Sequence, residues 1–214
     1  MGDELRGENL VHLNVRFSTE TELKKIQDFL YEKSGQGVSF TGLVEAMVNE
    51  VTIVTAVHNI KSNKGSKTAG VDKIKIDKYL QMPKDELILL IQSCFRNYRP
   101  KPARREYIEK SNGKKRPLGI PTVLDRIIQE CVRIIIEPIC EARFYPQSYG
   151  FRPYRAQKHA IRGIINVINA GCKSPDQPVW AIEGDIKGCF DNINHRLLLQ
   201  KLWRIGIHDK RVLK

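Results

Sequence analysis

The sequence of 214 residues lacks several features that would place it in a familiar class of protein. No apolar stretch approaches the roughly 20 residues of a membrane-spanning helix, and residues 1–6 contain no secretory apolar segment. The five cysteines show no Cys-x-x-Cys spacing, so we expect neither a zinc site nor a disulfide framework. These absences indicate a protein that does not enter a membrane and that works in a reducing, cytoplasmic compartment.

Two catalytic signatures are also missing. Gly65 and Gly70 have the spacing of a phosphate-binding loop, but Val71 and Asp72 follow them where that loop requires Lys and then Ser or Thr. A Walker-type nucleotide site is therefore excluded. No two aspartates are adjacent anywhere in the chain, and this limits any chemistry that needs paired metal-binding carboxylates.

What the sequence has in excess is positive charge. Lysine and arginine number 36 against 24 aspartates and glutamates, which gives a formal net charge of +12. An excess of this size favours a polyanionic partner, and nucleic acid is the leading candidate. The chain is also 41% hydrophobic, so it can bury a core and form one large domain or two small ones.

Half of this charge excess lies between Arg99 and Arg116, a segment with eight basic and two acidic residues. Asn112-Gly113 predicts a two-residue hairpin turn inside the segment. Such a hairpin would gather the cations at its tip beside the apolar residues 117–121, a combination that suits a nucleotide. A solvated charged surface is the plain alternative.

Two further polar segments have two interpretations each. The loop from Lys61 to Gly70 is rich in lysine and suits contacts with a nucleic-acid backbone, and a loop that is only solvated carries equal weight. Residues 147–155 interleave aromatic side chains with arginines. They could stack on nucleic acid, or they could pack in a core around structural arginines.

Local patterns predict several helices. Thr19 and Glu22 form a capping-box pattern at one helix start, and apolar spacing predicts further helices over about 41–59, from Pro83 to before Pro100, from Thr122 onward, over 160–171 and over 196–203. Pro138 should end or kink the helix that Thr122 caps.

Near residue 180 the pattern changes to that of a strand. The apolar run 179–182 predicts a short buried strand leading to Asp185. A carboxylate fixed at a strand end can bind Mg²⁺ by hard oxygen ligation. Alternatively, the strand only ends in a turn, and Asp191 or Asn192 caps the next helix.

Four blocks of residues occur in an order typical of one family. They are Lys-Thr-Ala-Gly-Val-Asp at 67–72, the run 110–122, Tyr-Gly-Phe-Arg-Pro at 149–153, and Gly-Asp-Ile-Lys-Gly-Cys-Phe-Asp-Asn-Ile at 184–193. From about residue 38 onward the chain resembles group II intron-encoded reverse transcriptases, also called maturases. Retron and diversity-generating reverse transcriptases share parts of these blocks.

The resemblance implies an α+β fold, that of the fingers and part of the palm of a right-hand polymerase. It would be mostly helical, with a β-hairpin and a small antiparallel palm sheet. Residues 1–37 would form an N-terminal extension, residues 38–120 the fingers, and residues 121–214 the remaining fingers and the first part of the palm, before the second catalytic motif.

The resemblance also implies roles at the catalytic centre. Asp185 would be a catalytic ligand of Mg²⁺, with the Ile186 carbonyl as a further ligand. Lys110 and Arg116 would hold the triphosphate of the incoming deoxynucleotide, and Phe190 would exclude a ribose 2′-hydroxyl.

Other residues would bind the template and the RNA backbone. The template-binding set implied by the resemblance is Leu118, Gly119, Ile120, Pro121 and Arg152. The basic residues that we expect on the RNA backbone are Lys61, Lys64, Lys67, Arg104, Arg105, Lys114 and Lys115.

The function implied is RNA-directed DNA polymerisation that copies intron RNA for homing, together with assistance in splicing. Structured intron RNA, a template-primer and deoxynucleotides would be the partners. Because the chain contains no Asp-Asp pair, we expect it to be an inactive part of a longer enzyme. A non-catalytic RNA-binding module and a retron-type enzyme are the alternatives, and the sequence leaves open whether the chain forms a homodimer.

Overall fold

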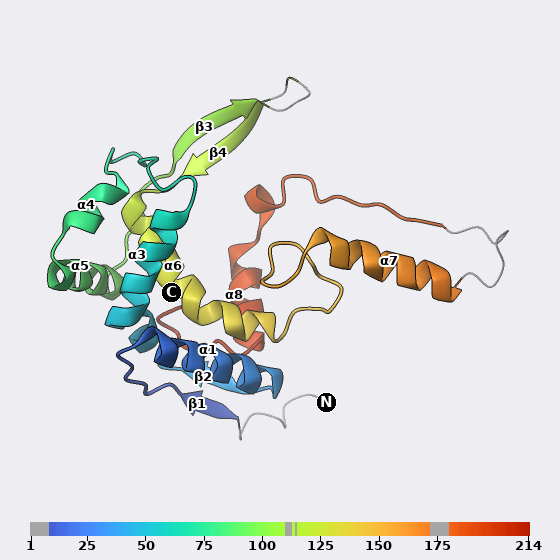
Figure 1. Ribbon diagram of the computed structural model, residues 1–214, viewed down its shortest axis with the longest axis horizontal. Coiled ribbons are helices and arrows are strands. Elements are labelled where there is room, and N and C mark those ends of the chain that lie inside the picture. Colours follow the sequence, from blue (N-terminus) through green and yellow to red (C-terminus); the bar gives the residue numbers. More distant parts are fainter. Residues whose placement is uncertain (1–8, 110–112, 114, 172–179) are drawn as a thin grey trace.

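The computed structural model describes residues 9–109, 113, 115–171 and 180–214. It has the predicted α+β class, with a helical body from which a β-hairpin and one helix project (Figure 1). The elements are β1 (Leu10–His12), α1 (Glu20–Gly35), β2 (Ser39–Thr41), α2 (Leu43–Met47), α3 (Glu50–Ser62), α4 (Ile76–Gln81), α5 (Lys84–Arg96), β3 (Arg104–Glu109), β4 (Lys115–Ile120), α6 (Val123–Glu141), α7 (Gln157–Gly171), η1 (Phe190–Asn192) and α8 (His195–Arg204).

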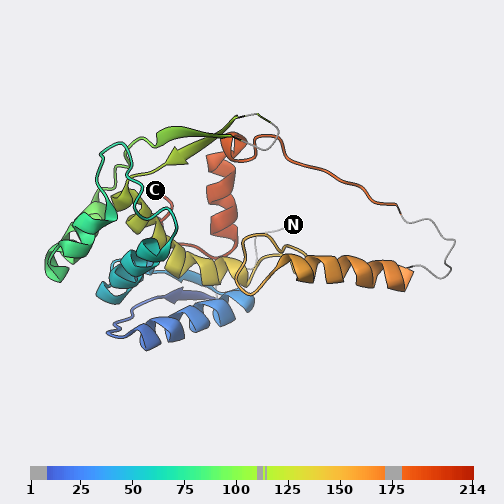
Figure 2. The same cartoon turned by 45° about the horizontal axis from the view of Figure 1, so that its top comes forward.

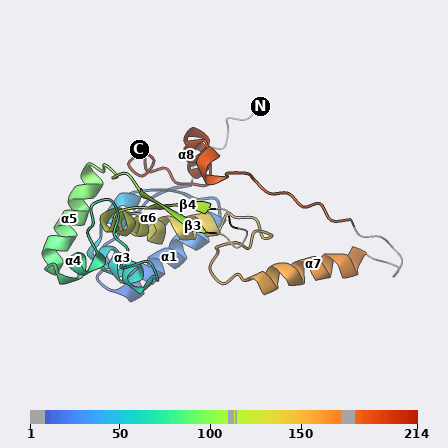
Figure 3. The same ribbon diagram turned by 90° about the horizontal axis from the view of Figure 1, so that it is seen from above.

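Helix α6 is the centre of the helical body and packs against α1, α2 and α3. It begins as predicted, since the Thr122 hydroxyl accepts a hydrogen bond from the Asp125 amide. Its fully buried face consists of Val123, Ile127, Cys131, Ile135 and Ile139. Burial of each large aliphatic side chain stabilises the fold by about 1.5–3 kcal/mol. Helices α4 and α5 lie at one end of the molecule and α7 at the other (Figures 2 and 3).

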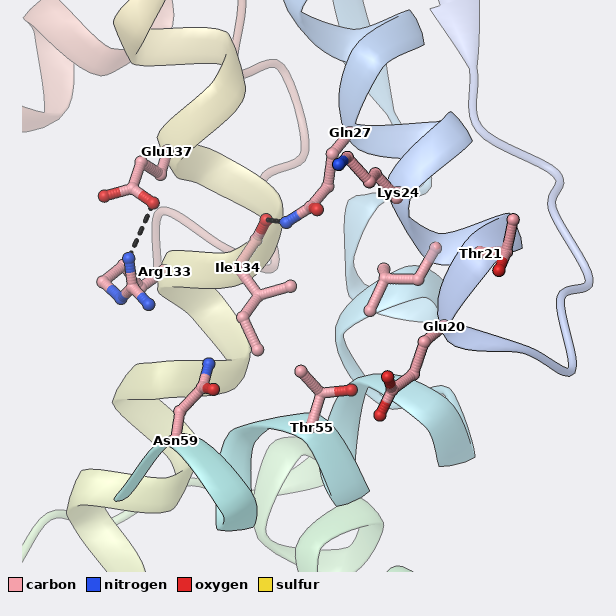
Figure 4. A pocket seen from close by; sticks show the side chains of 10 residues that line it. Glu20, Thr21, Lys24, Gln27, Thr55, Asn59, Arg133, Ile134 and Glu137 are labelled. Carbon is pink, nitrogen blue, oxygen red and sulfur yellow. Dashed lines mark hydrogen bonds and ion pairs between the residues drawn. The ribbon is translucent and has the colours of Figure 1, made fainter. Parts of the chain in front are cut away.

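Of the two effects expected of Pro138, an end or a kink, the first does not occur, because α6 continues to Glu141. A proline has no N–H, so the carbonyl of Ile134 loses its partner within the helix. Gln27 of α1 supplies the replacement, because its Nε2 donates to that carbonyl at 2.9 Å (Figure 4). A bond between two helices therefore compensates for the one that proline removes.

The other helix predictions are partly correct. The capping box of α1 is confirmed, since Thr19 and Glu22 each accept a hydrogen bond from the backbone amide of the other. Helix α5 begins after Pro83 and ends before Pro100 as predicted. The helix predicted over 41–59 is instead divided into α2 and α3, because Asn49 caps a new helix by accepting from the Val51 amide.

The hairpin is confirmed as the antiparallel pair β3 and β4, but its register differs from the prediction. Glu109 pairs with Lys115, so an odd number of residues lies between them. A two-residue turn needs an even number. Gly113 has a φ of 74°, which is the left-handed conformation that odd-numbered hairpin loops assign to glycine. Residues 110–112 and 114 lie outside the described residues.

The strand predicted before Asp185 is absent from the part that the structure describes, residues 180–186. Trp180 and Ile182 are exposed there rather than buried. A strand is stabilised by hydrogen bonds to a neighbour, and no described segment pairs with these residues. The following helix, α8, is capped by Asn194 and not by Asp191 or Asn192, which lie in η1.

Helix α7 is described from Gln157 to Gly171, and its predicted end at Gly171 borders residues outside the described ones. Among the described helices none is long and apolar enough to cross a membrane.

The two terminal regions of the described chain pack on each other. Strand β1 runs parallel to β2, and Phe40 of β2 also bridges to Ile207. The buried Asp209 carboxylate accepts from the Leu43 amide at 2.9 Å, and Arg211 binds both Asp209 and Glu45. Burial alone would raise the pKa of Asp209, but the hydrogen bonds from Arg211 and the backbone outweigh it and lower the pKa.

This packing crosses the predicted boundary between residues 37 and 38, since β1 and β2 lie on either side of it. The division into extension, fingers and palm stays a prediction.

Changing Gln27 to alanine should destabilise the fold by about 1–2 kcal/mol, because the buried Ile134 carbonyl loses its donor. The free energy of unfolding in urea measures this cost. In a Pro138→Ala background the backbone N–H of residue 138 can donate to the same carbonyl, so the Gln27 change should cost clearly less.

The matched control for this cycle is Gln81→Ala. Gln81 is exposed at the end of α4 and its side chain forms no hydrogen bond with the described residues, so we expect a change within about 0.5 kcal/mol. An equal cost of Gln27→Ala with and without Pro138 would show that the bond does not compensate for the proline.

Candidate nucleic-acid interface

The lysine loop, residues 61–70, begins in the last turn of α3 and is attached to α6 by one arginine. Arg126 donates from Nη1 to the Gly65 carbonyl at 3.0 Å and from Nη2 to the Thr68 carbonyl. Burial lowers the pKa of Arg126, against the attraction of Asp72, but an arginine remains charged at neutral pH. The side chains of Lys61, Lys64 and Lys67 are exposed. The predicted phosphate-binding lysines thus lie on a loop whose backbone is fixed.

The same loop is attached to the hairpin. Arg104 of β3 donates from Nε to the Ala69 carbonyl at 3.2 Å. Gly70 packs directly on the start of α6, since a Cβ added to it would lie 2.6 Å from the Cα of Thr122. Only glycine permits this approach of two backbones. The lysine loop and the base of the hairpin therefore form one continuous unit, which we call the basic surface.

Asp125 joins the two ends of the hairpin segment. Its carboxylate accepts from the Tyr98 hydroxyl at 2.9 Å, before the hairpin, and from the Thr122 hydroxyl at 2.6 Å, after it. Burial and the bond to Asp125 raise the pKa of Tyr98. These contacts fix the direction in which the hairpin leaves the helical body.

The ladder of the hairpin separates the predicted residues onto two faces. Opposed residues of an antiparallel pair share a face, and the faces alternate along each strand. The pairing therefore places three residues predicted for the nucleotide and the template on the face of Arg104, namely Arg116, Leu118 and Ile120. The opposite face carries Arg105, Lys115 and Gly119.

The remaining predicted hairpin residues lie around these faces. Pro121 directly follows β4. Arg105, Lys115 and Arg116 are exposed and Arg104 is half-buried. Lys110 and Lys114 lie outside the described residues.

Asp185, Ile186 and Phe190 are exposed in the segment before α8. The backbone between them is shaped by Gly188, whose φ is 59°, and by Asn192, whose Nδ2 donates to the Gly188 carbonyl at 2.8 Å. The sequence interpretation gave Asn192 only a helix-capping role and did not foresee this contact.

The carboxylate of Asp185 and the carbonyl of Ile186 are oxygen donors of the kind that Mg²⁺ prefers. Their number does not suffice, because the described residues contain no group of three or more His, Cys, Asp or Glu that could hold a metal ion. The described chain thus offers part of a metal site, and no catalytic step through a metal follows from it.

Arg152 is engaged entirely within its own chain. Its Nε and Nη2 contact the Glu141 carboxylate at 3.0 and 2.9 Å, and Nη2 also donates to the Glu141 carbonyl. Nη1 donates to the carbonyls of Tyr145 and Ser148 at 2.9 and 3.0 Å. These contacts involve all three nitrogens of the guanidinium. The geometry gives Arg152 the role of fixing its loop, and its contact with a template stays a prediction.

Sequence reasoning missed Arg126, Asp125 and Tyr98. Asp125 had a local signal, because Thr-x-x-Asp is a variant of the capping pattern. Arg126 had none, since its two carbonyl partners lie 58 and 61 positions away in the chain.

The chain is similar both to the sequence profile of a protein family and to individual proteins. The sequence profile of the family described as "Reverse transcriptase (RNA-dependent DNA polymerase)" matches residues 108–214. The chain is 42% identical over 160 residues to the protein YkfC of Escherichia coli strain K12, an alignment that covers 71% of this chain and 39% of YkfC.

Two further relatives are named for introns. The chain is 41% identical over 169 residues to the group II intron-encoded protein LtrA of Lactococcus lactis subsp. cremoris, covering 75% of this chain and 25% of LtrA. It is 35% identical over 210 residues to a 91 kDa protein in the cob intron of Schizosaccharomyces pombe, covering 94% and 25%. The chain thus spans between a quarter and two fifths of the length of these relatives.

Proposed function

We propose a function from the premise that this chain belongs to the reverse transcriptase family and, within it, to the group II intron-encoded reverse transcriptases and maturases. In the whole protein it forms the fingers and the first part of the palm of an RNA-directed DNA polymerase. That protein copies intron RNA into DNA for homing and assists RNA splicing.

The basic surface is the observation that carries the RNA-binding part of the proposal. Its lysines stand on a loop that Arg126 and Arg104 hold in place, so binding RNA does not have to order the loop first. An interface that is already in its bound conformation loses less conformational entropy on association. Phosphates of structured intron RNA or of the template-primer are the partners that such a surface fits.

The two faces of the hairpin have different roles in this proposal. Arg116 and Lys110, of which only Arg116 is among the described residues, hold the triphosphate of the deoxynucleotide, while Leu118 and Ile120 on the face of Arg116 pack against the templating base. Arg105 and Lys115, on the opposite face, bind the RNA backbone. Phe190 limits the sugar to a deoxyribose.

Members of the reverse transcriptase family generally use divalent metal ions, and for this protein we propose Mg²⁺. Asp185 and the Ile186 carbonyl would supply part of its ligands. The ion, when bound, stabilises negative charge on the reacting phosphates and orients them. Because the chain contains no adjacent aspartates, we expect the 214 residues alone to bind RNA without extending a primer.

A second candidate function is RNA binding without chemistry. Two observations favour it. Hydrogen bonds hold the hairpin and the loop of the basic surface in place, whereas the segment around Asp185 is exposed. The same surface serves both functions, so the polymerase test must be made on the full-length protein.

For the compartment, we propose the cytoplasm. Burial raises the pKa of Cys131 to about 12 and that of Cys140 to about 11, so neither is a reactive thiolate.

Replacing Lys64 and Lys67 by glutamine should weaken binding of the chain to single-stranded RNA about tenfold near 0.1 M salt, because two phosphate contacts are lost. The slope of log K against log salt should fall by about 1.4, which is the value expected for two contacts on a single strand. Fluorescence anisotropy over a salt series measures both quantities.

The matched control is the double variant Lys25→Gln and Lys210→Gln. Both lysines are exposed and lie outside the basic surface, and their replacement removes the same net charge. If both pairs changed the affinity and the slope equally, the RNA would be responding to net charge, and the assignment of the lysine loop would be wrong.

In the full-length protein, Asp185→Asn should lower primer extension by several orders of magnitude, because a metal ligand is lost. Its affinity for RNA should stay within about twofold of the wild type, since the basic surface is unchanged. The control is Glu183→Gln, an exposed acidic residue two positions earlier. Normal extension by Asp185→Asn would remove this residue from the catalytic site.

A further inference from the structure

A group of large aromatic side chains stands exposed on the loop between α6 and α7. The exposed fractions are 48% for Phe144, 81% for Tyr145, 110% for Phe151 and 97% for Tyr154. We call these four residues the aromatic surface. Large apolar side chains that stand exposed close together in the chain are candidates for contact with a partner.

The loop that carries these rings is firmly held. Arg152 fastens it to the C-terminal end of α6 through Glu141, and the Phe144 ring lies 5.2 Å from the Arg152 guanidinium. Arg155 donates to the Pro146 carbonyl at 2.5 Å and lies 5.5 Å from the ring of Tyr149. The exposed rings are therefore presented by a fixed backbone.

The backbone is also strained at the two most exposed rings. Phe151 has a φ of 56° and Tyr154 a φ of 59°, in the left-handed region that residues with a side chain seldom adopt. Arg152 and Pro153 lie between them, and the contacts of Arg152 hold this conformation in place. Strained residues that a protein keeps by such contacts occur often at binding sites.

The segment that carries the aromatic surface and α7 has charges of one sign. Residues 142–171 contain five basic residues and no acidic one. Lys158 and Arg162 are exposed on the first turns of α7, and the half-buried Arg155 lies just before it. Aromatic rings beside positive charges are what single-stranded nucleic acid requires, because bases stack on the rings and phosphates pair with the cations.

A groove of about 690 Å³ lies between α1, the end of α6 and this loop, and Tyr31, Tyr149 and Tyr154 line part of it. Three carboxylates line it as well, those of Asp28, Glu137 and Glu141, together with Lys24 and Arg155. Carboxylates can accept hydrogen bonds from the amino groups of bases. The groove thus suits bases, while Lys158 and Arg162 of α7 are not among its lining residues and suit the backbone.

We propose that the aromatic surface binds unpaired bases of RNA by stacking on Phe151 and Tyr154. Arg155, Lys158 and Arg162 contact the adjoining phosphates. This inference rests on the proposed RNA-binding function and adds a second contact region, at the opposite end of α6 from the lysine loop. Arg152 is a positioning residue in this account, since it holds the loop and does not touch the RNA.

The test compares two short single-stranded RNAs of equal length, one with all its bases and one with several abasic riboses. The wild-type chain should bind the RNA with bases about tenfold more tightly, because abasic positions keep the phosphates and cannot stack. The double variant Phe151→Leu and Tyr154→Leu keeps apolar side chains without rings. It should bind both RNAs with the same, weaker affinity.

The matched control is Phe29→Leu, an exposed aromatic residue of α1 that should leave the discrimination intact. As a test that needs no variant, RNA carrying 5-iodouridine should crosslink to Phe151 or Tyr154 of the wild-type chain on irradiation. Crosslinks confined to other residues would overturn the proposal even if the double variant failed to fold, which circular dichroism would reveal.

The outcomes separate this inference from the function on which it rests. If the wild-type chain bound neither RNA, the proposed function itself would fail. If it bound both RNAs alike with the salt dependence expected of the lysine loop, only the stacking proposal would fail. If the double variant kept the discrimination but lost self-association in sedimentation, the aromatic surface would be a protein contact, and the proposal would again be wrong.

Discussion

Burial of α6 against α1, α2 and α3 is the constraint on which the rest of the molecule depends. One face of the helix is apolar and fully buried, whereas its two ends carry polar side chains that bind neighbouring segments. At the first end, Asp125 and Arg126 hold the hairpin and the lysine loop. At the last end, Glu141 holds Arg152 and the aromatic loop. The spacing between the two regions assigned to RNA is therefore the length of one buried helix.

A continuous α6 is needed for this arrangement, and the sequence places a proline inside it. The bond from Gln27 to the Ile134 carbonyl removes the cost of an unpaired carbonyl at that point. It also ties α6 to α1, whose capping box fixes its own start. On the other side of the body, Asp209 and Arg211 attach the last described residues to α2. Each of these bonds limits how far the elements around α6 can shift.

Features that depend on nearby residues could be predicted from the sequence. The caps at Thr19 and Thr122 and the antiparallel hairpin are set by contacts within a few positions, and the patterns for them were correct. The division of α2 from α3 was missed, because Asn49 can either continue a helix or cap the next one. The strand before Asp185 was wrongly expected, because an apolar run does not show whether a pairing neighbour exists.

The candidate site was predictable in its residue types but not in its architecture. The lysines of the loop and the basic residues of the hairpin stood out by charge alone. That Arg126 and Arg104 join them depends on partners tens of positions apart, which no local pattern reveals. Arg152 was expected beside a template, and only the structure shows that all three of its guanidinium nitrogens contact Glu141 of α6 or carbonyls of its own loop.

The central claim is that α6 holds the lysine loop in place before RNA binds, and amide hydrogen exchange on the free chain tests it most directly. The amides of Ser66 and Thr68 donate to carbonyls within the loop, and Arg126 binds the Gly65 carbonyl that Thr68 also uses. In Arg126→Met these amides should exchange at least about tenfold faster. The control is Arg204→Met, a change at an exposed residue of α8, which should leave their exchange rates unchanged. Equal exchange in the wild type and in Arg126→Met would contradict the account.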